Sequence, residues 1–171
     1  MTTTTAVTTA LRLNDVRKVY PMGDGSEVVA LDHATLTVGS DEIVALVGPS
    51  GSGKTTLCSI AGGILSATEG RIIVGDEDIS DHDAKQLTKF RQETVGFVVQ
   101  SVNLVPFLYA REIQLVVVER ASRTGKPSRD RADQLLEELG LADRATHLPS
   151  QLSGGQRQRV GIGGGLMNDP T

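Results

Sequence analysis

A glycine-rich turn between an apolar run and a helix-forming segment constrains this chain more than any other feature. The apolar run, residues 43–47, predicts a buried strand, and a helix can begin near Gly53. Between them, residues 48–55 match the pattern G-x-x-x-x-G-K-T, which in a strand, turn, helix context is the phosphate-binding P-loop. The alternative is a glycine-rich turn that binds nothing. We favour a nucleotide site.

The residue types in this turn suit phosphate chemistry. Glycines let successive backbone N–H groups point into one concavity, where they can hold phosphate oxygens. Lys54 is expected to reach the β- and γ-phosphates, the Thr55 hydroxyl to ligate Mg²⁺, and Thr56 to assist beside the α-phosphate. The expected nucleotide-binding residues are Gly48, Pro49, Ser50, Gly51, Ser52, Gly53, Lys54, Thr55 and Thr56.

Length and composition exclude several classes of protein. The 171 residues, 39% of them apolar, suit one domain with a core. A formal charge of −4 and 3% aromatic residues argue against a general nucleic-acid binder. No apolar run approaches the roughly 18–20 residues of a membrane span. Residues 1–10 lack a signal-peptide pattern and predict a disordered tail. The single cysteine, Cys58, fits a reducing cytosol and predicts a small buried apolar residue.

Strand patterns dominate the first part of the chain. Residues 11–20 and 28–38 predict two strands, the second with a central kink, and residues 71–74 predict a short third strand. Two strands before the P-loop unit indicate an antiparallel flap beside a parallel core. The apolar residues 95–99 predict a further buried strand, which ends at Gln100.

Helical patterns dominate the second part. Asp83 and Gln86 have the spacing of a capping box, which opens a helix to about Gln92. Residues 123–129 predict a solvated basic loop, and Gly140 predicts the end of the helix before it. The apolar helical faces are Ile113, Val116, Val117 and Ala121 in one helix and Ala132, Leu135, Leu136 and Leu139 in the next.

A second motif, L-S-G-G-Q, occupies residues 152–156. Ser153 and Gln156 again have capping-box spacing, and the two glycines between them expose backbone N–H groups. By itself this motif suits either an anion site or an ordinary capped helix.

Together, the P-loop and L-S-G-G-Q make the chain resemble the ATP-binding cassette (ABC) ATPases from about Leu11 to Thr171. The resemblance implies an α/β P-loop (RecA-like) core with an N-terminal antiparallel β flap and an α-helical subdomain, the C-terminal part of the core being absent. Residues 11–171 would form one incomplete domain. Its parts would be the flap and P-loop core at 11–99, a helical subdomain at 101–152 and a signature helix at 153–167.

The resemblance also assigns roles to residues. Tyr20 would stack on adenine, unless it is simply an amphipathic aromatic at a strand end. Gln100 would contact Mg²⁺ and the attacking water, which adds it to Lys54 as a catalytic residue and to Thr55 as a metal ligand. The signature residues, which would meet the ATP held by a second cassette, are Leu152, Ser153, Gly154, Gly155 and Gln156.

The implied function is that of the ATP-binding subunit of an ABC transporter. Its cofactors would be ATP and Mg²⁺, and its partners a membrane permease and a second cassette, in a homo- or heterodimer. It would be cytoplasmic, on the inner face of the cell membrane. Residues 95–108 and the insertion after Tyr20 look like the lipoprotein-release and macrolide-export class.

Two departures from the family pattern bear on mechanism. The sequence stops at Thr171, before the Walker B Asp-Glu and the switch histidine, so we do not expect turnover by this chain alone, and we expect the isolated chain to be poorly stable. Four glycines among residues 161–165, with Gly164 where the family has Arg, should cost the helix about 4 kcal/mol relative to alanine. Either this helix frays, or the segment is degenerate or wrongly assigned to a helix.

Other hypotheses remain at this point. The chain could be a non-hydrolysing ATP-binding fragment, regulatory or degenerate, or a soluble ABC ATPase of DNA repair or translation. A GTPase is disfavoured because the sequence has neither N-K-x-D nor D-x-x-G.

Overall fold

The computed structural model describes residues 8–99, 103–119 and 125–170, with the side chains of residues 118 and 119 left aside. These residues divide into two compact units, with the division between Lys89 and Phe90. Each unit is described by itself.

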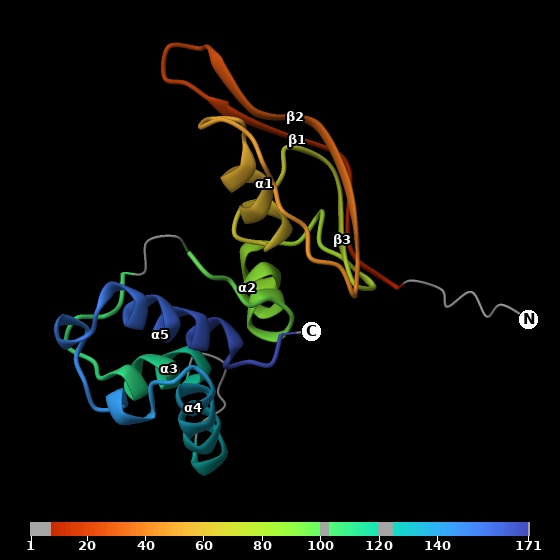
Figure 1. Ribbon diagram of the computed structural model, residues 1–171. Helices are drawn as coiled ribbons and strands as arrows, with labels where there is room; N and C mark the ends of the chain where they lie inside the picture. The colour runs from red at the N-terminus through yellow and green to blue at the C-terminus, as the bar shows by residue number, and fades with distance from the viewer. Residues whose placement is uncertain (1–7, 100–102, 120–124, 171) are drawn as a thin grey trace, which may run out of the picture. The chain divides into compact units, whose positions relative to one another are not determined.

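A four-stranded antiparallel sheet forms the body of the first unit (Figure 1). Its spatial order is β2-β1-β3-β4. The strands are β1 (Thr9–Pro21), β2 (Glu27–Gly39), β3 (Glu69–Val74) and β4 (Glu77–Asp78). The three strands predicted from the sequence are therefore confirmed. The prediction of a tail over residues 1–10 is wrong at its end, because β1 already begins at Thr9.

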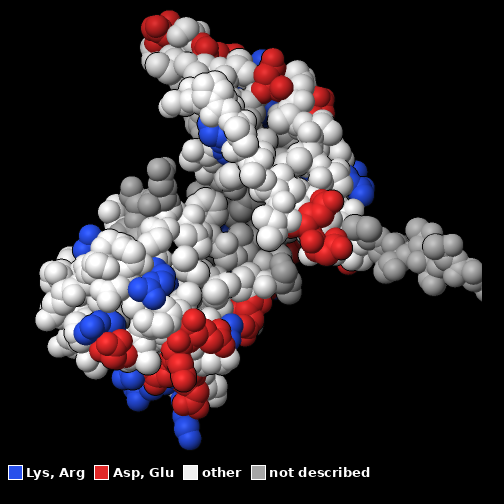
Figure 2. All heavy atoms as spheres, in the orientation of Figure 1, with Lys and Arg blue, Asp and Glu red and all other residues white. Residues whose placement is uncertain are grey.

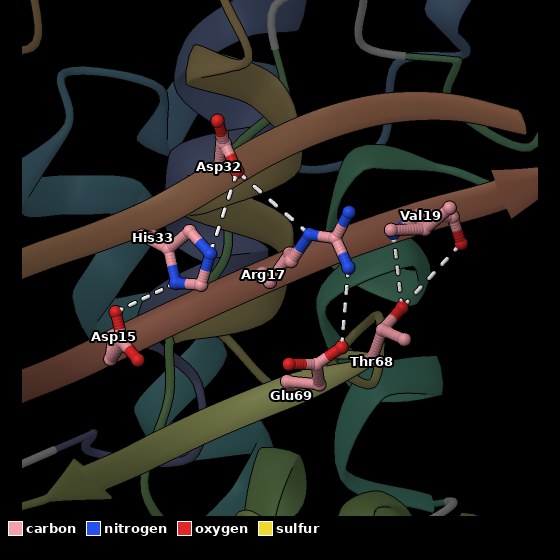
Figure 3. A network of polar contacts seen from close by, with 7 residues as sticks. All are labelled: Asp15, Arg17, Val19, Asp32, His33, Thr68 and Glu69. Carbon is pink, nitrogen blue, oxygen red and sulfur yellow. Dashed lines mark hydrogen bonds and ion pairs between the residues drawn. The ribbon is translucent and has the colours of Figure 1, made fainter.

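The hairpin of β1 and β2 is kinked in its middle, as the sequence indicated. Asp15 and His33 lie on the two strands and both have left-handed backbones, with φ of 54° and 49°. The Nδ1 atom of His33 is 2.8 Å from Oδ1 of Asp15 (Figure 3). Gly70 of β3 fits this bend, because a Cβ at Gly70 would overlap the Asp15 carbonyl oxygen. The bulged strand thus allows the third strand to approach closely.

Helix α1 (Lys54–Ala61) packs on this sheet, contacting β1, β2 and β3. Ile60 is buried where the helix meets the sheet, whereas Cys58 is exposed. The prediction of a buried cysteine is therefore wrong. The amphipathic helix directs Ile60, rather than Cys58, inward.

Two predicted buried strands are absent. Residues 43–47 and 95–99 are not in strands, and the described residues contain no parallel pairing. Ile43 and Val47 are almost fully exposed, and Phe97, Val98 and Val99 are exposed by more than a third. A strand needs a neighbour to satisfy its backbone, and neither segment has one among the described residues.

Helix α2 (Ala84–Glu93) begins as predicted. The Gln86 N–H donates to Oδ1 of Asp83 at 2.8 Å, and the Asp83 N–H donates to Oε1 of Gln86 at 2.8 Å. These reciprocal bonds form a capping box.

The second unit includes the end of α2 and, among the described residues, the helices α3 (Ala110–Glu119), α4 (Lys126–Glu138) and α5 (Gly154–Leu166). Short 3₁₀ turns lie at Ala142–Arg144 and Pro149–Gln151. Gly140, with φ of 66°, follows the end of α4, as predicted. The predicted basic loop at 123–129 is wrong beyond Gly125, because α4 starts at Lys126 with Pro127 in its first turn, where proline is favourable. The core residues are Ala110, Ala132, Leu135, Leu136, Leu141, Ala145, Leu152, Val160 and Met167.

Helix α5 runs through the glycine-rich segment without a break, so the alternative of a frayed helix is wrong. Gly163 lies against the buried Gln114 of α3, whose Nε2 donates to the Val160 carbonyl at 2.7 Å. Gly165 lies against Val98 and the backbone of Phe97. Tertiary packing thus supports residues whose helix propensity is low.

Acidic and basic side chains lie next to one another over the helical unit, on the face shown in Figure 2. Two of the ion pairs are Arg111–Asp133 and Arg131–Asp169. None of the helices among the described residues has the length and hydrophobicity of a membrane span.

Candidate nucleotide-binding site

Gly53 fixes the turn that leads into α1. Its backbone is left-handed, with φ of 84° and ψ of 0°, a conformation that glycine adopts at little cost. A Cβ there would lie 2.5 Å from the Ala30 carbonyl oxygen and 2.9 Å from Cδ2 of Leu31. The residue before α1 must therefore be glycine for both conformational and steric reasons.

The start of α1 leaves backbone donors open. No side chain caps this helix, and the N–H groups of Lys54, Thr55 and Thr56 donate to no acceptor in the part of the chain that the structure describes. The first internal bond runs from the Leu57 N–H to the Gly53 carbonyl at 2.8 Å. Such donors, with the positive end of the helix dipole, favour an anion.

The Lys54 side chain folds back over the turn. Its Nζ donates to the carbonyl oxygens of Gly48 at 2.9 Å and Pro49 at 2.7 Å, and to Oγ of Ser52 at 3.2 Å. The ammonium group is thereby held over the same turn as the open N–H groups. Phosphate oxygens would compete with these neutral acceptors, and charge-assisted bonds are the stronger kind.

A cavity of about 300 Å³ opens at this turn, which is within the size range of ligand clefts. Its polar side carries the glycines of the turn and Lys54, and its apolar side is formed by leucine and valine side chains. The lining residues are Leu31, Leu46, Val47, Gly48, Pro49, Ser52, Gly53, Lys54 and Leu57. The structure thus gathers much of the predicted turn around one hollow.

The predicted metal ligands are only partly described. Thr55 is exposed in the first turn of α1. Gln100 lies outside the described residues. No group of three or more His, Cys, Asp or Glu side chains among the described residues is placed to hold a metal ion. A role for Thr55 or Gln100 at Mg²⁺ stays a prediction.

Tyr20 lies near the end of β1 and pairs with Val28 of β2. Tyr20 is 37% exposed, so part of this residue is open to solvent. Two residues earlier, Lys18 pairs with Leu31, which lines the cavity. The end of β1, which carries Tyr20, therefore lies next to Leu31 and the cavity at the glycine-rich turn.

The L-S-G-G-Q motif lies in the second unit, at the start of α5. The Gln156 N–H donates to Oγ of Ser153 at 3.2 Å, and the Ser153 N–H donates to Oε1 of Gln156 at 2.8 Å. Leu152 is buried, whereas Gly154 and Gly155 are exposed. The predicted capping box is confirmed.

Arg157 is a residue that the sequence reasoning missed. Its NH1 donates to the carbonyl oxygens of Leu152 at 2.8 Å and Pro149 at 3.4 Å, so it ties the helix start to the preceding turn. Ala30 and Leu31, against Gly53, were also missed. The only sequence signal for Ala30 and Leu31 was that they lie in the strand that precedes the P-loop.

The comparisons with known proteins agree with this geometry. The ABC transporter family matches residues 31–171. The chain belongs to the ABC transporter family. Macrolide export ATP-binding/permease protein MacB from Burkholderia pseudomallei is 43% identical over 92% of this chain. An ABC transporter ATP-binding protein of Methanocaldococcus jannaschii, MJ0796, is 40% identical over 94% of this chain and 69% of its own length.

A solved structure supports the fold of this ABC transporter ATP-binding domain. The dimeric, post-hydrolysis structure of the ATP-binding cassette MJ0796 bound to ADP and Pi matches with a TM-score of 0.85 and 38% identity, over 94% of this chain and 70% of that chain. The chain spans 24% of the length of the MacB relative. The fold is thus that of an ABC ATPase, an α/β protein whose described sheet is antiparallel.

Proposed function

We propose that this chain is the ATP-binding subunit of an ABC transporter. In this role, ATP binding and hydrolysis are coupled to the movement of a substrate by a membrane permease. The observation that supports ATP binding is the turn before α1, where open N–H groups, Lys54 and a cavity of about 300 Å³ occur together. An export role is supported by the likeness to the macrolide export protein MacB, whose name joins ATP binding to a permease. Lipoprotein release is the other member of the proposed class.

Each residue of the turn has a defined task in this proposal. The N–H groups at the start of α1 and Lys54 would hold the phosphates, the Thr55 hydroxyl would hold Mg²⁺, and Tyr20 would stack on adenine. In the assembled transporter, hydrolysis of ATP would supply the free energy for transport. Gln100 would orient the attacking water and contact the metal.

A second cassette completes the site. Ser153, Gly154 and Gly155 of one subunit contact the γ-phosphate that Lys54 of the other subunit holds. Support comes from the dimeric MJ0796 structure and from the exposure of both glycines beside the Ser153 cap. The Ser153 hydroxyl accepts a bond from Gln156, which leaves its own proton free to donate.

The test is ATP-dependent dimerisation of Gly154→Glu. A carboxylate at the first position of α5 interacts favourably with the helix dipole, so the variant should fold and bind MgATP in its own P-loop. It should repel a γ-phosphate brought by a second copy. Light scattering with chromatography should show that wild type dimerises with a non-hydrolysable ATP analogue and that the variant stays monomeric.

The matched control is Ala84→Glu, which adds the same charge to the first turn of α2 and should dimerise as wild type does. Dimerisation of Gly154→Glu at wild-type strength would exclude the contact in trans. Failure of wild type to bind MgATP by calorimetry would refute the proposed function as a whole.

A further inference from the structure

Lys18 lies beside Tyr20 on β1. Its ammonium nitrogen is 5.1 Å from the centroid of the Tyr20 ring, within the distance at which a cation is attracted to a ring face. The same nitrogen donates to the Ser66 carbonyl oxygen at 2.8 Å. The cation is thus held at one face of the ring by a contact outside the strand.

The backbone around Lys18 is also fixed. The Val19 N–H donates to Oγ1 of Thr68 at 3.0 Å, and the Thr68 N–H donates to the Arg17 carbonyl at 2.8 Å. Arg17 in turn forms an ion pair with Glu69 at 3.3 Å. Figure 3 shows the Val19–Thr68 and Arg17–Glu69 contacts, which join β1 to the start of β3 and to the residue before it. Lys18 therefore projects from a backbone held on both sides of it.

Occupation of one ring face leaves the other for a ligand. Tyr20 is 37% exposed, and Leu31, which pairs with Lys18, lines the cavity at the P-loop. A planar base bound beside that cavity must then stack on the ring face that Lys18 does not occupy. The ring would be ordered before the ligand arrives, which reduces the entropy that binding must lose.

We propose that Lys18 is a positioning residue for nucleotide binding, which holds the Tyr20 ring so that an adenine base stacks on its opposite face. This inference rests on the proposed ATP-binding function. Lys18 acts only through Tyr20 and does not contact the phosphates. Its contribution therefore depends on the base of the ligand and on the presence of the ring.

The experiment compares Lys18→Met, which keeps the apolar stem, with Lys18→Arg, which keeps the cation. MgATP and Mg-tripolyphosphate, which has no base, are titrated calorimetrically into the full chain. Lys18→Met should lower the affinity for MgATP roughly two- to fivefold and leave that for tripolyphosphate unchanged, and Lys18→Arg should restore the MgATP affinity. Lys85→Met, at an exposed position on α2, should change neither.

A Tyr20→Ala background provides the second measurement. There, Lys18→Met should have no further effect on MgATP affinity. An equal loss of ATP and tripolyphosphate affinity in Lys18→Met would show a structural or phosphate-binding role and overturn the proposal. The proposal would also be overturned if Lys18→Met lowered the MgATP affinity by the same factor in the Tyr20→Ala background. If the wild type bound neither ligand, the proposed function would fail instead.

Discussion

The starts of α1 and α5 differ in how the N–H groups of the first helical turn are satisfied. Each helix begins beside glycines, and each must account for the N–H groups of its first turn. In α1 the preceding residue is a left-handed Gly53 without a side-chain cap, and the first N–H groups have no acceptor in the described residues. In α5, Ser153 and Gln156 cap one another.

This difference in capping suggests a phosphate-binding site at the start of α1 and a surface for a second subunit at the start of α5. An open helix start has donors to offer an anion, whereas a capped start has used one of them internally. We therefore expect α1 to bind phosphate within one subunit and α5 to contribute only when a second copy presents a nucleotide. The following predictions test this contrast, from the largest effect to the smallest.

Replacing Lys54 should have the largest effect. Lys54→Ala removes the ammonium group held over the turn, and the loss of charge-assisted bonds to phosphate should weaken MgATP binding roughly 100-fold or more. Calorimetry measures the change, and Lys126→Ala, at the start of α4, is the control. Unchanged affinity in Lys54→Ala would remove the P-loop from the binding site.

Gly53→Ala should reduce stability as well as binding. The substitution forces a left-handed backbone on alanine and places a Cβ 2.5 Å from the Ala30 carbonyl oxygen, which should cost at least about 2 kcal/mol. Urea unfolding measures the loss. Gly155→Ala, whose Cβ would meet nothing within 4 Å, should lose no stability. Equal losses at both positions would contradict the contrast between the two helix starts.

These two helix starts also show how far sequence reasoning reaches. Motifs with local geometry were predictable: the glycine-rich turn before α1 and the Ser153 and Asp83 capping boxes follow from residue types at fixed spacing. The structure of the apolar residues 43–47 and 95–99 was not predictable, because apolar composition cannot show whether a strand has a neighbour to pair with. Residues 43–47 and 96–99 are exposed in the structure.

Contacts between residues that are distant in the sequence were also not predictable. Helix propensity predicted that the glycines of α5 would fray, and it could not reveal the buried Gln114 that lies against Gly163. Nothing in the sequence indicated that Ala30 lies against Gly53. Such contacts depend on tertiary packing, which sequence spacing does not encode.

Ser153→Ala should lower the free energy of unfolding by about 1 kcal/mol, because the N-cap of α5 is lost. Ser153→Asn, which can still cap, should retain most of that stability. MgATP binding to the monomer should be unchanged in both variants. A marked loss of monomer affinity in Ser153→Ala would show that α5 reaches the nucleotide within one subunit.

Alanine in the body of α5 should have the smallest effect. Gly164→Ala should raise stability by about 0.5–1 kcal/mol, since its Cβ would be 3.8 Å from Cγ2 of Val117. Gly163→Ala should bring no gain, since its Cβ would lie 2.8 Å from Nε2 of Gln114. Thermal unfolding compares the two variants. An equal gain at both would show that Gln114 does not restrict the helix.

The central claim is that the open start of α1, and not the capped start of α5, is the phosphate site of one subunit. The most direct measurement is the backbone amide NMR spectrum of the ¹⁵N-labelled monomer during titration with Mg-tripolyphosphate. We predict large, saturable shifts for Gly53, Lys54 and Thr55 and none for Gly154 and Gly155. Shifts of equal size at both helix starts, or shifts at α5 alone, would contradict it.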